Sequence, residues 1–262
     1  MQKSQVEEKR ITINGIGINY KIAGKGPALL ILHGWGRGSD SWEAVQVRLA
    51  QQGYRVLVPD LPGFGKTEAP KSVWGVKEYA DFILQFAEML RLHRFILFGH
   101  SFGGQVAVWF AAAHPEKLEK LILVAPAAIR KEPGPRENVI KYVAKAGSIV
   151  LSLIPSEKIQ GFLRKVFTRI IGRSDYLEAG EIKRKIMQKV IREDLSELFS
   201  HISTNTLLLW GEKDRPVPIE DAYVIKRQLP NSSLKIIPGA GHRIHREAPE
   251  QVAAAVLLFL RA

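Results

Sequence analysis

The chain contains no cysteine and only three methionines in 262 residues. The lack of cysteine excludes disulfide bonds and metal sites built on thiolates, but it is compatible with either redox compartment. Long hydrophobic runs are also missing, because the longest, such as residues 149–154, are far too short to span a bilayer. Residues 1–10 are polar and charged, so we expect no secretory signal and a cytoplasmic protein.

Negative charge is scarce relative to positive charge. The 26 acidic residues are outnumbered by 38 Lys and Arg, which gives a net charge of +12. The excess is local, because residues 130–192 hold 15 Lys and Arg but 6 Asp and Glu. We interpret this segment first as a solvated helical face, with attraction of anionic substrates or of an anionic membrane surface as alternatives. The sequence contains no known nucleic-acid module and this segment lacks exposed aromatic stacking positions, so we expect no nucleic-acid partner.

The pattern of apolar residues predicts an α/β fold. Two early runs, 10–14 and 16–23, alternate apolar and polar residues around Asn14-Gly15, which is typical of a hairpin. Short apolar runs without alternation, typical of parallel strands buried on both faces, follow at 28–32, 55–58, 95–98, 121–124, 206–210 and 233–237. Helix-like segments lie between most of them, at 40–52, 76–92, 102–114, 219–228 and 248–260. This alternation predicts a doubly wound, mostly parallel sheet.

The alternation of strands and helices stops in one interval, residues 129–203, where no strand is expected and the apolar residues have helical periodicity alone. Between Ile159 and Ile170 the apolar residues follow the spacing of an amphipathic helix. We therefore predict two domains, a core formed by 1–128 with 204–262 and a helical lid formed by 129–203. Ligands bind at the carboxyl ends of the strands in such sheets, where we expect the lid to lie. A lid must also pack its apolar face on the core.

The most informative motif is Gly99-His100-Ser101-Phe102-Gly103-Gly104. It follows an apolar strand and precedes a helical pattern, which is the context of a nucleophile elbow with Ser101 at its apex. The alternative is an ordinary strand-to-helix loop with a capping serine. A serine hydroxyl needs a base to take its proton, and histidine suits this near neutral pH.

Among the seven histidines, His242 lies just after the strand at 233–237, behind the small residues of Gly239-Ala240-Gly241. We predict that His242 is the base. His245 is the competitor, because its spacing from His242 resembles a metal pair, although no H-E-x-x-H arrangement surrounds it. We expect no metal and no cofactor.

The acid that orients the base should also follow a strand, and Asp214 does so in Trp210-Gly211-Glu212-Lys213-Asp214. Glu212 is the alternative candidate for this acid. Asp60 also ends a strand, but its Gly- and Pro-rich turn favours a carboxylate that binds its own backbone.

Acyl transfer also requires donors for an oxyanion. The loop His33-Gly34-Trp35-Gly36 follows the strand at 28–32, and its glycines let the backbone turn inward. We predict that the backbone N–H groups of Trp35 and Phe102 form the oxyanion hole. The alternative for the loop is a plain Gly-rich turn.

Jointly and in this order, these motifs resemble the α/β-hydrolase superfamily over essentially the whole chain. The resemblance implies an eight-stranded sheet with a helical cap, inserted before the strand that carries the acid. The His-Gly-Trp-Gly loop is similar to that of small carboxylesterases, and cofactor-free perhydrolases have a related loop. Carbon–carbon hydrolases share the plan, but their usual aromatic residue after the catalytic histidine is replaced here by Arg243.

The resemblance implies a serine hydrolase that cleaves carboxylic esters through Ser101, His242 and Asp214. The alternatives are carbon–carbon hydrolysis or perhydrolysis on the same residues, and a ligand-binding protein without catalysis, because a fold alone does not give a function. The expected partner is a small-molecule ester. Contact of the basic lid with a membrane surface is a lesser alternative, and the chain is expected to be a monomer or a homodimer.

Overall fold

The computed structural model of the protein describes residues 5–130 and 180–262. The predicted lid, 129–203, therefore lies largely outside the described residues, as does the amphipathic pattern between Ile159 and Ile170. In the described part of the chain, no helix is long and apolar enough to cross a membrane.

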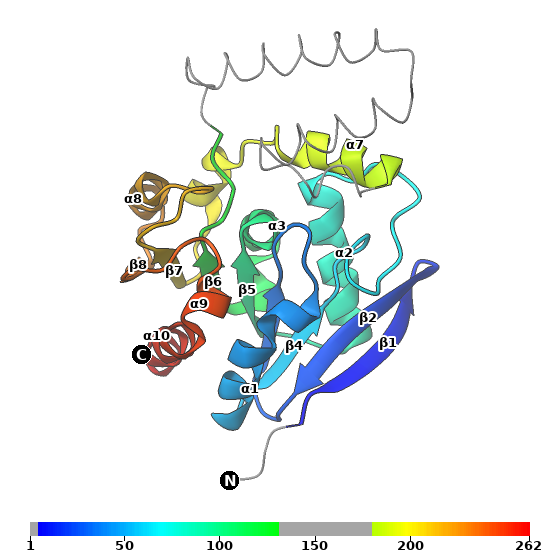
Figure 1. Cartoon of the computed structure of the whole chain (residues 1–262), viewed down its shortest axis with the longest axis horizontal. Coiled ribbons are helices and arrows are strands. Elements are labelled where there is room, and N and C mark those ends of the chain that lie inside the picture. Colours follow the sequence, from blue (N-terminus) through cyan, green and yellow to red (C-terminus); the bar gives the residue numbers. More distant parts are fainter. Residues whose placement is uncertain (1–4, 131–179) are drawn as a thin grey trace, which may run out of the picture.

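Eight strands form one sheet in the order β1-β2-β4-β3-β5-β6-β7-β8 (Figure 1). Their bounds are β1 Glu7–Ile13, β2 Ile16–Ala23, β3 Ala28–Leu32, β4 Arg55–Pro59, β5 Phe95–His100, β6 Leu118–Val124, β7 Thr206–Gly211 and β8 Ser232–Ile237. The β1–β2 and β2–β4 pairs are antiparallel, and every other pair is parallel. The predicted hairpin and the mostly parallel, eight-stranded sheet are thus confirmed.

Helices cover both faces of this sheet (Figure 1). One core contains the apolar residues of α2 (Val76–Met89), α3 (Phe102–Ala113) and α8 (Ile219–Gln228). The other contains those of α1 (Glu43–Gln51), α9 (Ile244–Glu247) and α10 (Pro249–Arg261). The strands β3, β5, β6 and β7 are buried almost throughout, because helices exclude water from both of their faces.

The described part of the predicted lid packs on the core. It contains α7 (Glu181–Val190) and a 3₁₀ turn at Ser196–His201. Ile186 and Val190 of α7 are buried in the core that contains α2 and α3. Gln105 near the start of α3 donates a hydrogen bond to the carbonyl of Val190 at 3.2 Å. The end of α7 therefore lies close to the carboxyl end of β5, where the serine motif begins.

Two local features differ from the sequence-based expectation. The helix expected over 40–52 is divided into a 3₁₀ turn, Ser39–Trp42, and α1. At the start of this turn the Ser39 N–H donates to the Asp60 carboxylate, and the Ser41 N–H donates to Gly38 O at 3.1 Å. The short helix α9 directly after the His242 loop was not expected.

Candidate active site

Ser101 occupies the sharp turn between β5 and α3 in a strained backbone conformation, with φ 54° and ψ −112°. A non-glycine residue with positive φ is uncommon and persists only where its surroundings hold it. Hydrogen bonds supply that support: the Ser101 N–H donates to Val124 O at 3.0 Å, and Ser101 O accepts from the N–H groups of Gln105 and Ala127. The predicted strand–turn–helix geometry of the motif is present.

The glycines of the motif are required by close packing of the backbone. A Cβ atom on Gly103 would collide with the carbonyl oxygen of Leu32, and one on Gly104 would lie 2.7 Å from Pro126 Cα. One on Gly99 would lie 2.7 Å from the Cβ of Ala107. The turn can therefore lie against β3 and the end of β6 only because these side chains are missing.

We expect Gly103→Ala to lower the free energy of unfolding by about 3 kcal/mol, because a rigid carbonyl rather than a flexible side chain blocks the added methyl group. Urea denaturation measures this change. Gly180→Ala is the matched control, since a Cβ there meets nothing within 4 Å and its φ is −55°. Equal stability of the two variants would contradict this explanation of the motif.

His242 links Ser101 to Asp214. Its Nε2 lies 3.0 Å from Ser101 Oγ and its Nδ1 lies 2.7 Å from Asp214 Oδ2. The Asp214 side chain is fully buried, whereas 19% of the His242 side chain is exposed. The other Asp214 oxygen, Oδ1, accepts from the Val217 N–H at 2.9 Å. Both carboxylate oxygens thus have partners, so the buried charge is satisfied.

The loops that carry Asp214 and His242 are held against each other by backbone contacts. The Lys213 N–H donates to Ala240 O at 2.8 Å, and a Cβ on Gly211 would lie 2.6 Å from that same oxygen. Trp210 Nε1 donates to Val217 O at 2.9 Å, which closes the turn around Asp214. A rigid platform of this kind fixes the distance between carboxylate and imidazole.

The two other carboxylates considered from sequence have structural roles. Glu212 Oε2 accepts from the Gly239 N–H at 2.7 Å, so it is directed at the start of the His242 loop. Asp60 accepts from the N–H groups of Lys66 and Ser39. Burial opposes its ionisation, but these hydrogen bonds outweigh burial and hold the pKa of Asp60 below its ordinary value. The prediction that Asp60 binds its own backbone is confirmed.

His245, the competing histidine, stacks on Trp42, with ring centroids 4.3 Å apart. It is buried, and in the described residues neither ring nitrogen has a hydrogen-bond partner. The same part of the chain contains no group of three or more His, Cys, Asp or Glu able to hold a metal ion. In the described residues His245 therefore forms no hydrogen bond to Ser101, and His242 occupies the position expected of the base.

His100 has a structural role that sequence reasoning missed. Its Nε2 lies 2.9 Å from the backbone oxygen of His242, and its ring also contacts the His242 ring. Burial, followed by the charges of His242 and His245, holds the pKa of His100 well below its ordinary value. The neutral ring therefore donates from Nε2 and anchors the His242 loop. No sequence signal links two residues so far apart in the chain.

Three buried histidines make the fold sensitive to acid. Burial lowers the pKa of His33 and His100, and burial with the charges of Arg246, His242, Arg37 and Arg243 lowers that of His245 to about 3. Below the unfolded pKa of 6.5 the unfolded chain therefore binds more protons than the folded chain. Stability is fully present above that value and is lost as the pH falls.

We expect His245, whose folded pKa of about 3 lies well below its unfolded value of 6.5, to contribute about 1.4 kcal/mol per pH unit to the loss of unfolding free energy between those two pKa values. In His245→Gln the free energy of unfolding should therefore fall less steeply with decreasing pH, by that same amount per pH unit. Urea denaturation at a series of pH values measures this slope. His201→Gln, at an exposed position on the 3₁₀ turn, should keep the wild-type slope. Identical slopes in the wild type and His245→Gln would refute the assignment.

The predicted oxyanion donors lie beside Ser101. A Cβ on Gly34 would lie 3.4 Å from Ser101 Cβ, so the loop with Trp35 passes directly over the serine. The Trp35 and Phe102 rings contact each other at 5.3 Å between centroids. Phe102 is the first residue of α3, so its N–H has no acceptor within the helix. His33 Nε2 accepts from the Leu61 N–H at 2.9 Å and so fixes the start of this loop.

Comparison with known proteins agrees with this architecture. A family model described as the alpha/beta hydrolase fold matches residues 27–147. A 2-hydroxy-6-oxo-6-phenylhexa-2,4-dienoate hydrolase from Burkholderia cepacia is 28% identical, and the alignment covers 96% of each chain.

Two solved structures are also similar. A thermophilic esterase from Thermogutta terrifontis, with malate bound, has a TM-score of 0.72 and 28% identity over 97% of this chain and 98% of the esterase. A serine hydrolase involved in carbazole degradation has a TM-score of 0.76 and 25% identity over 98% of this chain and 99% of that protein. With the sheet order and the strand–serine–helix turn, these matches lead to one conclusion: the chain is a hydrolase that belongs to the α/β-hydrolase superfamily.

Proposed function

We propose that the protein is a serine hydrolase that cleaves carboxylic ester bonds through Ser101, His242 and Asp214. The observation that carries the proposal is the unbroken hydrogen-bonded series from Ser101 Oγ through both nitrogens of His242 to a buried carboxylate. The strained conformation of Ser101 adds support, because such conformations cluster at functional sites. The similarity to a thermophilic esterase agrees with ester hydrolysis.

In the proposed reaction, Ser101 Oγ attacks the ester carbonyl carbon while its proton passes to His242 Nε2. The carbonyl oxygen becomes an oxyanion that accepts hydrogen bonds from the N–H groups of Trp35 and Phe102. The carbon–oxygen bond to the alcohol then breaks, and His242 gives the proton to the departing alcohol. Water, activated by His242, attacks the acyl-enzyme, releases the carboxylic acid and restores the serine.

Asp214 supports both steps by accepting a hydrogen bond from the Nδ1–H group of His242. This fixes the tautomer in which Nε2 is free to take a proton, and it stabilises the imidazolium that forms. The lid over residues 129–203 remains part of the proposal and would supply contacts to the acyl or alcohol group.

The second candidate function is hydrolysis of a carbon–carbon bond by the same residues. It is favoured by the 28% identity to the Burkholderia cepacia dienoate hydrolase. It is opposed by Arg243, which takes the place of the aromatic residue that follows the catalytic histidine in such enzymes.

The test is hydrolysis of p-nitrophenyl esters from acetate to palmitate, with Ser101→Ala as control. We expect turnover that disappears in the variant, and the preferred chain length measures the depth of the acyl pocket. If the folded wild type hydrolyses none of these esters and a fluorophosphonate does not label Ser101, the proposal fails. Labelling without turnover of esters would favour carbon–carbon hydrolysis instead.

A further inference from the structure

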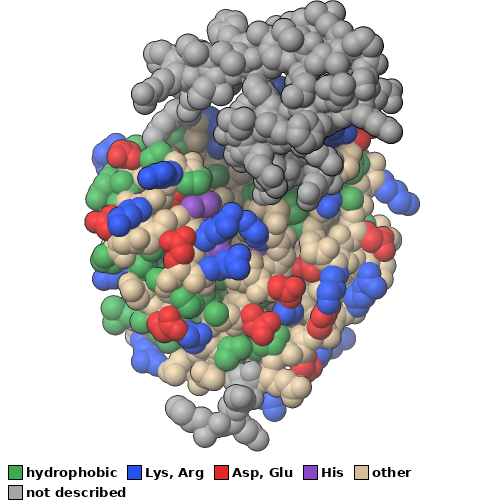
Figure 2. All heavy atoms as spheres, in the orientation of Figure 1, with side chains coloured by type: hydrophobic (Ala, Val, Ile, Leu, Met, Phe, Trp, Pro, Cys, Tyr) green, Lys and Arg blue, Asp and Glu red, His purple; other side chains and the backbone are tan. Residues whose placement is uncertain are grey.

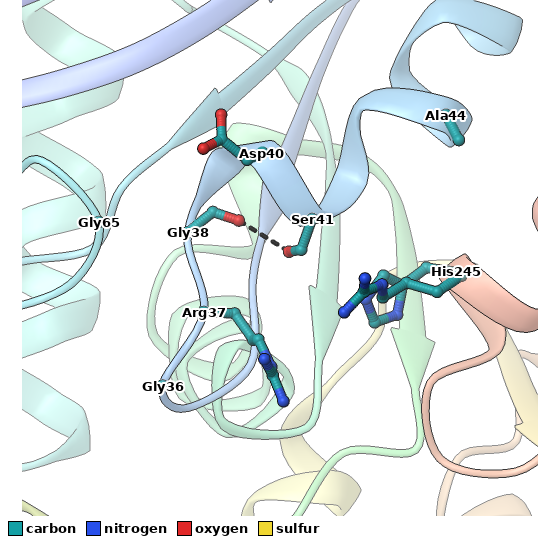
Figure 3. Close-up of a pocket in the computed structure, with 9 residues that line it drawn as sticks. Gly36, Arg37, Gly38, Asp40, Ser41, Ala44, Gly65 and His245 are labelled. Carbon is teal, nitrogen blue, oxygen red and sulfur yellow. Dashed lines mark hydrogen bonds between the residues drawn. The ribbon is translucent and has the colours of Figure 1, made fainter. Parts of the chain in front are cut away.

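A pocket of about 570 Å³ opens beside the candidate active site (Figure 3). It lies between the end of the oxyanion loop, the 3₁₀ turn before α1, and α9. The residues that line it are Gly36, Arg37, Gly38, Asp40, Ser41, Ala44, Gly65, His245 and Arg246. Arg37 is three residues from Gly34, where an added Cβ would lie 3.4 Å from Ser101 Cβ, and α9 begins two residues after His242. The pocket is therefore close to the reacting groups in the chain and in space.

Two arginines line this pocket, and the charge of a third acts on its wall. Arg37 and Arg246 line it, and the charges of Arg246, Arg37 and Arg243 all act on the ring of His245 in its wall. Arg243 directly follows His242, so the cluster extends to the base itself. The arginine cluster, Arg37, Arg243 and Arg246, brings together three positive charges from two segments of the chain.

These charges lack acidic partners. Within residues 5–130 and 180–262, none of the three guanidinium groups forms an ion pair with a carboxylate. The one acidic residue in the pocket lining, Asp40, is paired with Lys21 at 2.6 Å. Glu247, next to Arg246, directs its carboxylate to the Gly241 N–H at 2.6 Å.

An uncompensated arginine cluster in a concave site attracts anions. Like charges raise the energy of the empty site, and a concave surface concentrates their field. The guanidinium group binds a carboxylate through two parallel hydrogen bonds, which adds orientation to attraction. Figure 2 shows Lys and Arg side chains gathered beside a histidine in the middle of one face of the molecule.

One wall of the pocket is a buried, stacked pair of rings. His245 is 2% exposed and stacks on Trp42, which is itself completely buried. Arg37 lies on the loop that His33 fixes through Leu61. The arginines therefore project from backbone that packing and hydrogen bonds hold in place, which favours a fixed orientation of an anion bound between them.

We propose that Arg37, Arg243 and Arg246 form a subsite for a carboxylate carried by the ester substrate, so that the enzyme prefers half-esters of dicarboxylic acids over neutral esters. The inference rests on the proposed ester hydrolysis. It assigns the cluster to substrate selection, because one segment carries an oxyanion donor and the other carries the base. A substrate carboxylate held there leaves the ester carbonyl at Ser101.

The test compares kcat/KM for monomethyl adipate, which is anionic, and dimethyl adipate, which is neutral, by measuring release of methanol. We expect the wild type to prefer the anionic ester. Arg37→Gln and Arg246→Gln should each lower the ratio of the two values about tenfold, chiefly through KM for the anionic ester. High salt should reduce the wild-type preference, because the arginines are partly or fully exposed.

Arg227→Gln is the matched control, because it removes one exposed arginine from the last turn of α8. It should keep the wild-type ratio. A free anion is the other source of the same chemistry, and inorganic phosphate is the probe for it. If phosphate inhibits the wild type and not the cluster variants, while all of them have the same ester ratio, the site binds free anions and the substrate subsite is wrong.

Failure of this inference differs from failure of the proposed function. If both adipate esters are hydrolysed by a Ser101-dependent route and the ratio is unchanged in the cluster variants, only the subsite is refuted. If neither ester is hydrolysed and Ser101 is not labelled by a fluorophosphonate, ester hydrolysis itself is refuted.

Discussion

Replacement of Ser101 by alanine is expected to lower kcat for ester hydrolysis by about a million-fold, to the residual rate that binding and oxyanion stabilisation alone support. The effect is large because the hydroxyl is the only group of the series placed to attack the carbonyl, at 3.0 Å from its base. Alanine meets the same backbone strain as serine at φ 54°, so the fold should be retained. Active-site titration with a fluorophosphonate and p-nitrophenyl ester kinetics measure the loss.

The matched control for this prediction is Ser200→Ala. Ser200 is exposed on the 3₁₀ turn at Ser196–His201, where its hydroxyl bonds only the Glu197 carbonyl. It should keep wild-type turnover and labelling. Substantial turnover by Ser101→Ala, with a thermal transition like that of the wild type, would remove Ser101 from the mechanism.

The positions of the strands could be predicted from sequence because the signals that mark them are local. The unbroken apolar run of β5 and the alternation around Asn14-Gly15 each report burial of a single segment. The turn around Ser101 could also be predicted from sequence, since its glycines mark positions where backbone contacts leave no space for a side chain. The strand order and the packing of α7 could not be predicted from sequence, because they depend on contacts between segments that are distant in the chain.

The same limit explains which parts of the site were missed. Ser101, Asp214 and His242 each follow a strand, so their convergence could be expected from the rule that carboxyl ends of parallel strands share one edge. The hydrogen bond of His100 to the backbone of His242 follows no such rule. Neither does the convergence of Arg37 with Arg246, because a short helix that sequence did not predict brings the second arginine to the first.

The acid can be identified by a substitution that changes one atom. In Asp214→Asn the side chain must still satisfy the Val217 N–H, which now meets Oδ1 at 2.9 Å. Keeping the amide oxygen there turns the NH₂ group toward His242 Nδ1 and makes that nitrogen an acceptor. The proton then resides on Nε2, which can no longer take one from Ser101. The reverse orientation would leave two buried donors facing each other, which costs more.

We therefore expect Asp214→Asn to lower kcat about ten-thousand-fold while the fold is preserved. Nitrogen NMR shifts of His242 should report protonation at Nε2 in the variant and at Nδ1 in the wild type. This readout separates a wrong tautomer from general damage to the site.

Glu212→Gln is the matched control, because glutamine can still accept the Gly239 N–H that Glu212 now binds. It should keep turnover close to that of the wild type and the wild-type tautomer of His242. The reverse result, an inactive Glu212→Gln beside an active Asp214→Asn, would make Glu212 the acid. That outcome would require the carboxylate at 212 to reach His242 Nδ1 in the working enzyme. Its present bond to the Gly239 N–H and the full burial of the Asp214 side chain both oppose this.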